Sequence, residues 1–301
     1  MRYLYLVAAA GLALGGAAGT SRAQTVDNVL GFPRQAVANK GTLVMCGGGG
    51  GTPEEVFDEF VRLAGGKDAR IVFIPSAGEF ADVEHARIHF AEWEEYGCAS
   101  LVYLDAKSRA EADTAAFVEP LKKATAVWIA GGDQERLARL CSGTKLATAV
   151  RDLLARGGVV GGISAGAAVM SQVMIRDGSN HEAAVGSGFG LIDGAIVDQH
   201  FSQRGRYARL LGLLEDRPNL VGLGVDEETS LIVQGNHLRV MGNARATVIL
   251  PGGDDGARIV YRLKAGQEAD LAITRSVQSG RRNIRLRLTE PTPPAVAKSA
   301  E

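Results

Sequence analysis

The feature that most constrains this chain is an alternation of short apolar runs with helical segments between residues 42 and 163. The apolar runs are residues 42–46, 70–74, 100–104, 126–129 and 158–160. Strands that are apolar throughout and alternate with helices form a parallel sheet covered on both faces. We therefore predict an α/β fold with a mostly parallel sheet and helices on both of its faces.

Helical patterns fill the segments between these runs. They cover residues 83–96, 114–124, 135–140 and 145–155. A further helix is expected to start at Thr52-Pro53-Glu54-Glu55, because this segment offers a cap, a proline for the first turn and acids that complement the helix dipole.

The later part of the chain has a different pattern. An apolar run at 221–225 predicts another strand, and residues 231–241 predict a β-hairpin. Further strands are expected at 247–250 and 258–263. We interpret this part as a C-terminal antiparallel β extension of the same domain.

The first residues have the pattern of a secretory signal peptide. Arg2 supplies a positive charge, residues 4–20 carry none, and Ser21-Arg22-Ala23 is a small-x-small cleavage site. We expect cleavage after Ala23, which would place the protein in the periplasm or outside the cell. A retained membrane anchor is the alternative, but the run has few large apolar residues. No membrane association is expected after cleavage.

The remaining chain is expected to contain one folded unit. Residues 24–40 are interpreted as an exposed leader and residues 41–288 as a single catalytic α/β domain. The Pro/Ala-rich residues 289–301 are expected to be disordered. With a net charge of -1, the chain lacks the basic surface that nucleic-acid binding favours.

The chain contains three cysteines, Cys46, Cys98 and Cys141. An exported chain can form disulfides, and three thiols allow at most one bond within a monomer. Cys46 ends a predicted buried strand, which favours a small buried hydrophobe there. No spacing of cysteine and histidine indicates a metal site.

A Gly-x-Ser-x-Gly sequence follows the apolar run 158–160, in Gly162-Ile163-Ser164-Ala165-Gly166. A strand, a small-residue turn and an Ala-rich helix form a nucleophile elbow, in which the serine hydroxyl is lifted clear of the sheet. Glycines are needed because the strained turn leaves no room for neighbouring Cβ atoms. The same residues also fit a packed strand–helix junction whose serine caps the helix.

A serine nucleophile needs a base and a group that orients the base. His200 follows a short apolar strand and can reach the same sheet edge as Ser164. Asp226-Glu227-Glu228 follows the strand at 221–225 and could supply the acid, although a solvated acidic turn is the alternative. The order serine, histidine, acid differs from that of the α/β-hydrolases, which run serine, acid, histidine.

Two glycine-rich turns lie at predicted strand ends. In Gly131-Gly132-Asp133-Gln134, the backbone N–H of Gly132 could join that of Ala165 to stabilise an oxyanion, or the turn could have no function. The run Gly47–Gly51 precedes a helix and could cradle a phosphate. It lacks the residues of a P-loop or a dinucleotide site, which favours a flexible loop bordering the cleft.

Arginines cluster just after His200, at Arg204, Arg206 and Arg209. They could bind substrate carboxylates through bidentate contacts. A helix start with solvated arginines is the alternative, since Tyr207 to Leu211 has a helical pattern.

Together these motifs resemble the cyanophycinase family of serine peptidases, which is related to aspartyl dipeptidase. The resemblance rests on Gly131-Gly132-Asp133-Gln134, the elbow around Ser164, residues 198–206 and residues 224–229. It covers roughly residues 41–250 and is most specific at 198–206. The glycine run at 47–51 is longer than the family pattern, and no motif matches after residue 250.

The resemblance implies a flavodoxin-like α/β fold similar to class I glutamine amidotransferase domains, a homodimer and no cofactor. It implies hydrolysis of cyanophycin, an aspartate backbone with arginine on each side-chain carboxyl, to β-Asp-Arg dipeptides. Carried over by motif, Ser164 is the nucleophile, His200 the base and Glu227 the orienting acid. The residues implied to line the substrate groove are Gln134, Asp198, Gln199, Arg204, Arg206 and Arg209.

Two other hypotheses fit the same sequence. One is a peptidase for short aspartyl or isoaspartyl peptides on the same fold. The other is a non-catalytic periplasmic binding protein, which predicts a broken triad, whereas Ser164, His200 and Glu227 are all present.

Overall fold

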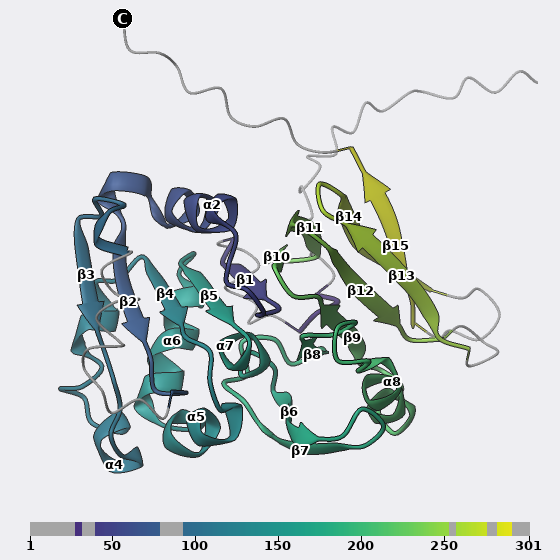
Figure 1. The fold of residues 1–301 in the computed structure, drawn as a ribbon, viewed down its shortest axis with the longest axis horizontal. Coiled ribbons are helices and arrows are strands. Elements are labelled where there is room, and N and C mark those ends of the chain that lie inside the picture. The colour runs from purple at the N-terminus through teal and green to yellow at the C-terminus, as the bar shows by residue number, and fades with distance from the viewer. Residues whose placement is uncertain (1–27, 32–39, 79–92, 253–256, 276–281, 291–301) are drawn as a thin grey trace, which may run out of the picture.

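The structure is a computed structural model that describes residues 28–31, 40–78, 93–252, 257–275 and 282–290 (Figure 1). The predicted signal peptide and most of the predicted leader, helix 83–96 and C-terminal tail lie outside these residues. Among the described helices, none combines the length and the apolar character needed to cross a bilayer.

The described part of the chain is built on one nine-stranded sheet (Figure 1). Its strands in spatial order are β15 (Arg282–Thr289), β14 (Glu268–Arg275), β11 (His237–Gly242), β10 (Thr229–Gln234), β1 (Thr42–Cys46), β5 (Val159–Ile163), β4 (Ala126–Ile129), β2 (Arg70–Ile74) and β3 (Ser100–Tyr103). From β1 to β3 all neighbours are parallel, and from β10 to β15 all are antiparallel. The predicted parallel sheet with an antiparallel extension is confirmed.

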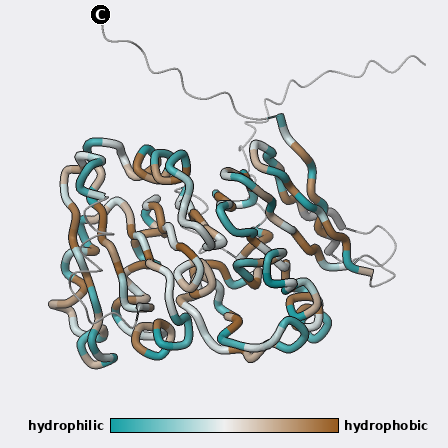
Figure 2. Tube along the Cα trace, viewed as in Figure 1, coloured by the Kyte–Doolittle hydropathy of each residue, from teal (hydrophilic) through white to brown (hydrophobic). Residues whose placement is uncertain are grey.

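Helices cover both faces of the parallel part, as predicted. Alternate residues of a strand point to opposite faces. Val44 of β1 packs with helix α2 (Glu54–Ala64), whereas its neighbour Leu43 belongs to the core that contains helices α5 (Gln134–Cys141) and α6 (Lys145–Ala155). Because both faces are buried, these strands are apolar throughout, and Figure 2 shows brown segments along them.

A second sheet lies beside the first and holds four strands. In order they are β13 (Ile259–Lys264), β12 (Arg245–Leu250), β9 (Val221–Val225) and β8 (Ala195–Gln199). Helix α8 (Tyr207–Glu215) packs on it through Leu210 and Leu214. A two-stranded ribbon, β6 (Val173–Gly178) and β7 (Ala183–Ser187), was not predicted. The C-terminal extension is therefore divided between two sheets.

The predicted helix at 114–124 is wrong. The chain forms a short helix α4 (Arg109–Ala112) earlier and then only a 3₁₀ turn, η2 (Glu119–Lys122). Pro120 lies in this turn, where its ring and missing N–H prevent an α-helix from running through it. A second 3₁₀ turn, η1 (Gly66–Asp68), follows α2.

The predicted cap of helix α2 is also wrong. Pro53 itself takes the N-cap position, and no side chain caps the helix. The acids at Glu54 and Glu55 do lie in the first turn, where they complement the helix dipole.

The prediction of an exposed leader is wrong at Val29 and Leu30. Leu30 is fully buried and belongs to the main core cluster. Its carbonyl accepts the amide of Gly194 at 3.0 Å, and the Val29 amide donates to the Asn236 side chain. An apolar pair can leave water here because its backbone groups find partners inside the protein.

We expect Leu30→Ala to lower the free energy of unfolding by about 2–5 kcal/mol, because it leaves a cavity in a closed core. Urea unfolding followed by circular dichroism measures the change. The matched control is Leu288→Ala on β15, where the leucine is 55% exposed and a change within about 0.5 kcal/mol is expected. Equal stability of the two variants would contradict the packing of residues 28–31.

Candidate active site

Ser164 lies at a sharp turn between strand β5 and the short helix α7 (Ala165–Ala168). Its φ of 52° is in the left-handed region, which is strained for a residue with a Cβ atom. A Cβ atom on Gly162 would lie 2.6 Å from the backbone of Gly166, and one on Gly166 would lie 2.1 Å from the Ile129 carbonyl oxygen. The glycines of the elbow are therefore required by close backbone approach, for the reason predicted.

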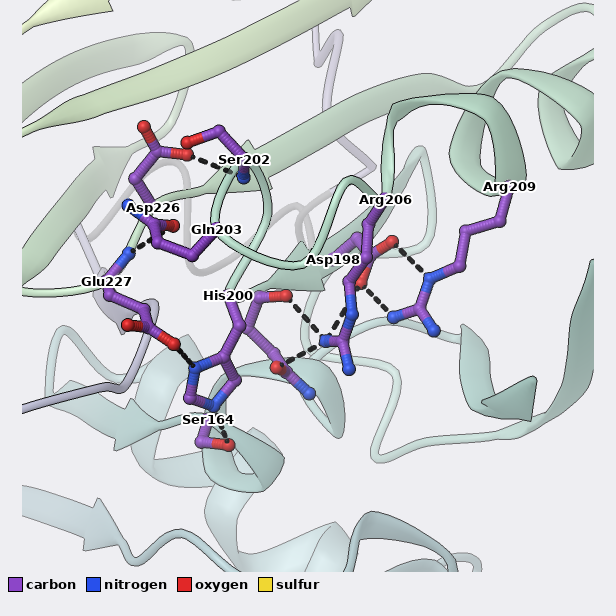
Figure 3. Close-up of polar contacts among 10 residues, drawn as sticks. Ser164, Asp198, His200, Ser202, Gln203, Arg206, Arg209, Asp226 and Glu227 are labelled. Carbon is purple, nitrogen blue, oxygen red and sulfur yellow. Dashed lines mark hydrogen bonds and ion pairs between the residues drawn. The ribbon is translucent and has the colours of Figure 1, made fainter. Parts of the chain in front are cut away.

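The Ser164 side chain does not cap helix α7. Its Oγ lies 2.9 Å from Nε2 of His200 instead (Figure 3). The alternative interpretation, a packed junction whose serine serves as a helix cap, is wrong.

His200 follows strand β8 and carries the second left-handed backbone of the site, with φ 47°. Its ring is buried, and Nδ1 lies 2.6 Å from Oε1 of Glu227, which follows strand β9 (Figure 3). Ser164, His200 and Glu227 thus form a continuous chain of hydrogen bonds. This arrangement can transfer a proton from the serine hydroxyl and orient the ring that receives it.

The surroundings keep the histidine in its basic form. Burial lowers the pKa of His200 below its ordinary value, the hydrogen bond to Glu227 opposes this shift, and the positive charge of Arg204 adds to it. The imidazole is therefore neutral at pH 7, with Nδ1–H donating to Glu227 and Nε2 able to accept the Ser164 proton.

The glycine run at 47–51 packs directly against these residues. The Gly47 carbonyl accepts the His200 amide at 2.9 Å, and the Gly48 carbonyl accepts the Glu228 amide at 2.8 Å. A Cβ atom on Gly48 would lie 2.4 Å from Cε1 of His200, and one on Gly49 would lie 2.5 Å from Cβ of Glu227. The run borders the cleft as predicted, and its first residues also fix the histidine and the acid.

A cavity of about 660 Å³ opens in front of Ser164 and His200. Four aromatic side chains form one wall, and the glycines at 48–51 and Gly131 also line it. The aromatic residues are Phe57, Phe73, Trp93 and Trp128. Sequence reasoning missed this wall, although Phe73 and Trp128 sit near the carboxyl ends of neighbouring parallel strands, where ligands bind in such sheets.

The predicted oxyanion donors lie at the two turns that meet at Ser164. Ala165 is the first residue of α7, and its N–H has no partner within the described structure. Gly132 has φ 139° and packs against the Ala77 carbonyl, while its neighbour Gly131 lines the cavity. A Cβ atom on Gly131 would lie 3.5 Å from Cβ of Ser164. The assignment of Gly132 stays a prediction.

Four of the six predicted substrate-binding residues are buried and bonded to one another. The buried carboxylate of Asp198 accepts two hydrogen bonds from the Arg209 guanidinium (Figure 3). In one of them, Arg209 Nε lies 2.8 Å from Asp198 Oδ2. Arg206 donates to the carbonyl of Gln199 at 2.6 Å and to its side chain at 2.7 Å. Burial lowers the pKa of Arg206 to about 10, so it remains a cation. These bonds fix the strand end that leads into His200.

The other two predicted substrate-binding residues are more accessible. Gln134 is the first residue of α5 and is half-buried, and Arg204 is exposed next to His200. None of the six lines the cavity in front of Ser164. Substrate contact by all six stays a prediction, with Arg204 the best placed cation.

The cysteines take no part in this site. Cys46, Cys98 and Cys141 are free, and burial raises the pKa of Cys46 to about 11. Cys46 is a small buried hydrophobe, as predicted. Among the described residues, no group of three or more His, Cys, Asp or Glu side chains is arranged to hold a metal ion.

Comparison with known sequences places the chain among peptidases. A sequence profile of peptidase family S51 matches residues 43–241. A cyanophycinase from Geminocystis herdmanii is 37% identical over 216 residues, which cover 69% of this chain and 77% of the relative. Cyanophycinases from Nostoc and Synechococcus elongatus are each 33% identical and cover 65% of this chain, with 68% and 63% of the relatives aligned.

A solved peptidase structure has a similar fold. The crystal structure of a peptidase from an acI-B1 Actinobacterium aligns with a TM-score of 0.58 at 27% identity. The alignment covers 76% of this chain and 96% of that one. The region that matches the family profile, residues 43–241, contains Ser164, His200 and Glu227.

We expect the labelling of Ser164 by a fluorophosphonate to fall at acidic pH with a midpoint below 6.5, because a histidine with a lowered pKa loses its basic form only below that value. Glu227→Gln removes the group that raises this pKa, so the midpoint moves to still lower pH and the plateau rate falls by about 10³–10⁴-fold. Labelling rates across a pH series measure both effects. Glu228→Gln, with its side chain turned to Asn243, is the control that should match the wild type.

We expect Gly48→Ala to reduce the labelling rate at least about a hundredfold, since the new methyl group displaces the His200 ring. Gly51→Ala is the matched control, because Gly51 also has a positive φ but has open space around it. Similar losses in the two variants would show that backbone strain, and not contact with the ring, is responsible.

Proposed function

This chain belongs to peptidase family S51, and from that membership we propose that it is a serine exopeptidase that hydrolyses cyanophycin to β-Asp-Arg dipeptides. The observation that carries the proposal is the hydrogen-bonded chain from Ser164 through His200 to Glu227. The names of the aligned relatives support the choice of substrate.

The first step forms an ester on Ser164. His200 Nε2 takes the proton from Ser164 Oγ as the oxygen attacks the scissile carbonyl carbon. The negative charge that develops on the carbonyl oxygen is stabilised by the backbone N–H of Ala165, with that of Gly132 as the proposed second donor. His200 then gives its proton to the leaving amine as the carbon–nitrogen bond breaks.

The second step releases the product. A water molecule gives a proton to His200 Nε2 and attacks the ester carbon, and the proton returns to Ser164 Oγ as the carbon–oxygen bond breaks. Throughout the cycle Glu227 accepts the Nδ1–H bond, which holds the ring and favours the imidazolium that forms twice. No cofactor is required in either step.

The positive charge beside His200 supports a substrate that carries carboxylates. Arg204 is exposed beside His200, and its positive charge is felt at the imidazole ring. A guanidinium in this position can bind a carboxylate through two parallel hydrogen bonds. In cyanophycin, each arginine leaves its α-carboxylate free for such a contact.

The proposal includes export and assembly. The sequence pattern of residues 1–23 supports secretion or release into the periplasm, where polymer freed from other cells would be the substrate. A homodimer is proposed from the family resemblance. The N-terminal sequence of the secreted protein tests export and cleavage, and analytical ultracentrifugation tests the homodimer.

We expect Ser164→Ala to abolish release of β-Asp-Arg from insoluble cyanophycin, because it removes the hydroxyl at the end of the hydrogen-bonded chain. The measurement is chromatographic detection of dipeptide, with unchanged circular dichroism as the control for folding. A parallel assay compares the turnover of soluble isoaspartyl dipeptides by the wild type with its turnover of the polymer. Faster turnover of those dipeptides than of the polymer would replace the proposal by a short-peptide peptidase.

A further inference from the structure

A second cavity, of about 380 Å³, adjoins the catalytic cavity. The two share the lining residues Thr52, Phe57 and Trp93, so they lie side by side. We call the second cavity the outer cavity. The residues that line it and not the catalytic cavity are Glu54, Glu95 and Tyr96. Its lining therefore combines aromatic rings with two carboxylates.

The aromatic part of this lining is rigid. Phe57 and Trp93 meet edge to face with ring centroids 5.0 Å apart, and Trp93 lies 6.2 Å from Tyr96. Trp93 also contacts Trp128 of the catalytic cavity at 5.1 Å. Trp93 is only 3% exposed, so its packing fixes the rings that both cavities present.

The carboxylates give the outer cavity a negative charge. Glu54 and Glu95 are exposed and come from different parts of the chain, the start of α2 and the segment just after Trp93. Among the described residues, neither carboxylate is held in an ion pair with a Lys or Arg side chain. The Thr52 hydroxyl at the junction is buried, and its side chain forms a hydrogen bond with the Cys46 thiol.

Aromatic faces and carboxylates together recognise cations. A guanidinium suits such a site better than an ammonium group, because it is planar, stacks on aromatic rings and fits a carboxylate with two parallel hydrogen bonds. The charges around Ser164 are then separated. The positive charge of Arg204 acts on His200, whereas Glu54 and Glu95 line the adjoining cavity.

We propose that the outer cavity, lined by Phe57, Trp93, Tyr96, Glu54 and Glu95, is a subsite that binds a guanidinium group of the substrate next to the cleaved unit. The inference rests on the proposed function, since it assigns a place to the arginine side chain of that substrate. It makes Glu54 and Glu95 determinants of specificity for arginine over a neutral side chain of the same shape.

The test compares the variant Glu54→Gln/Glu95→Gln with the control Asp58→Asn/Glu94→Gln. The control removes the same charge from exposed neighbours on the same two segments that do not line the cavity. Tryptophan fluorescence, in a Ser164→Ala background that prevents cleavage, measures the binding of a two-unit β-Asp-Arg segment and of the same segment with citrulline, a neutral isostere, in place of the neighbouring arginine. We expect wild type and control to prefer arginine, and the Glu54/Glu95 variant to bind it about five- to tenfold more weakly with citrulline binding unchanged.

Kinetics on a short soluble cyanophycin segment supply a second measurement. The Glu54/Glu95 variant should raise KM by a similar factor and leave kcat within about twofold, because the subsite does not touch the reacting atoms. The arginine preference should also weaken in high salt, since the carboxylates are exposed.

The outcomes separate the two proposals. If wild type cleaves the polymer but the Glu54/Glu95 variant binds arginine as well as the control does, the subsite is wrong and the proposed function stands. If wild type prefers arginine through these carboxylates but cleaves no cyanophycin, the proposed function is wrong and the subsite stands. Equal binding of arginine and citrulline by wild type overturns the subsite whatever the turnover.

Discussion

Three successive carbonyl groups at the end of strand β1 hold the active site together. The carbonyls of Cys46, Gly47 and Gly48 accept the amides of Ser164, His200 and Glu228 at 2.9, 2.9 and 2.8 Å. Ser164 follows a strand of the nine-stranded sheet, and His200 follows a strand of the four-stranded sheet. These main-chain bonds therefore set the distance between two sheets, and glycine is needed at 48 and 49 because the triad side chains lie where Cβ atoms would be.

The same bonds explain how strained backbones persist at the site. A left-handed residue with a side chain costs about 1–3 kcal/mol and survives only where its surroundings determine it from several sides. Ser164 and His200 are both left-handed, and each is tied by its amide to β1. The buried pair of Asp198 and Arg209 adds a further restraint on the strand before His200. Such a pair is costly to break because it leaves an unpaired charge in the interior.

Much of the fold was predictable because both faces of its parallel strands are buried. Such strands are uniformly apolar, and the prediction located all five of them. The triad was predictable because each member closely follows a strand. The expectation that His200 reaches the same sheet edge as Ser164 is wrong, because the strands before His200 and Glu227 belong to the four-stranded sheet, and the three side chains meet between the two sheets. The sequence signal was weaker for β14, whose apolar run is only three residues long, and for β15, which alternates charged and apolar residues.

Other features depend on contacts between distant residues and have no local signal. Leu30 can be buried because residues 193–194 and Asn236 supply hydrogen-bond partners for the backbone of Leu30 and its two neighbours. Arg206 and Arg209 were expected to face substrate, but burial of Asp198 turns Arg209 inward. The aromatic wall arises where α2 meets the strand ends and the segment at Trp93. By contrast, Pro120 is a local signal against the helix predicted at 114–124, where the helical periodicity of the sequence is misleading.

The pairing of β1 with β10 has a consequence for how the chain acquires reactivity during synthesis. Val44 pairs with Ile232, so the sheet closes around β1 only after most of the polypeptide has been made. The base and the acid also come after the nucleophile in chain order. A nascent chain that ends before Glu227 holds the serine turn but no complete proton relay. The nascent chain therefore lacks a complete triad during synthesis, and peptidase activity requires the complete fold.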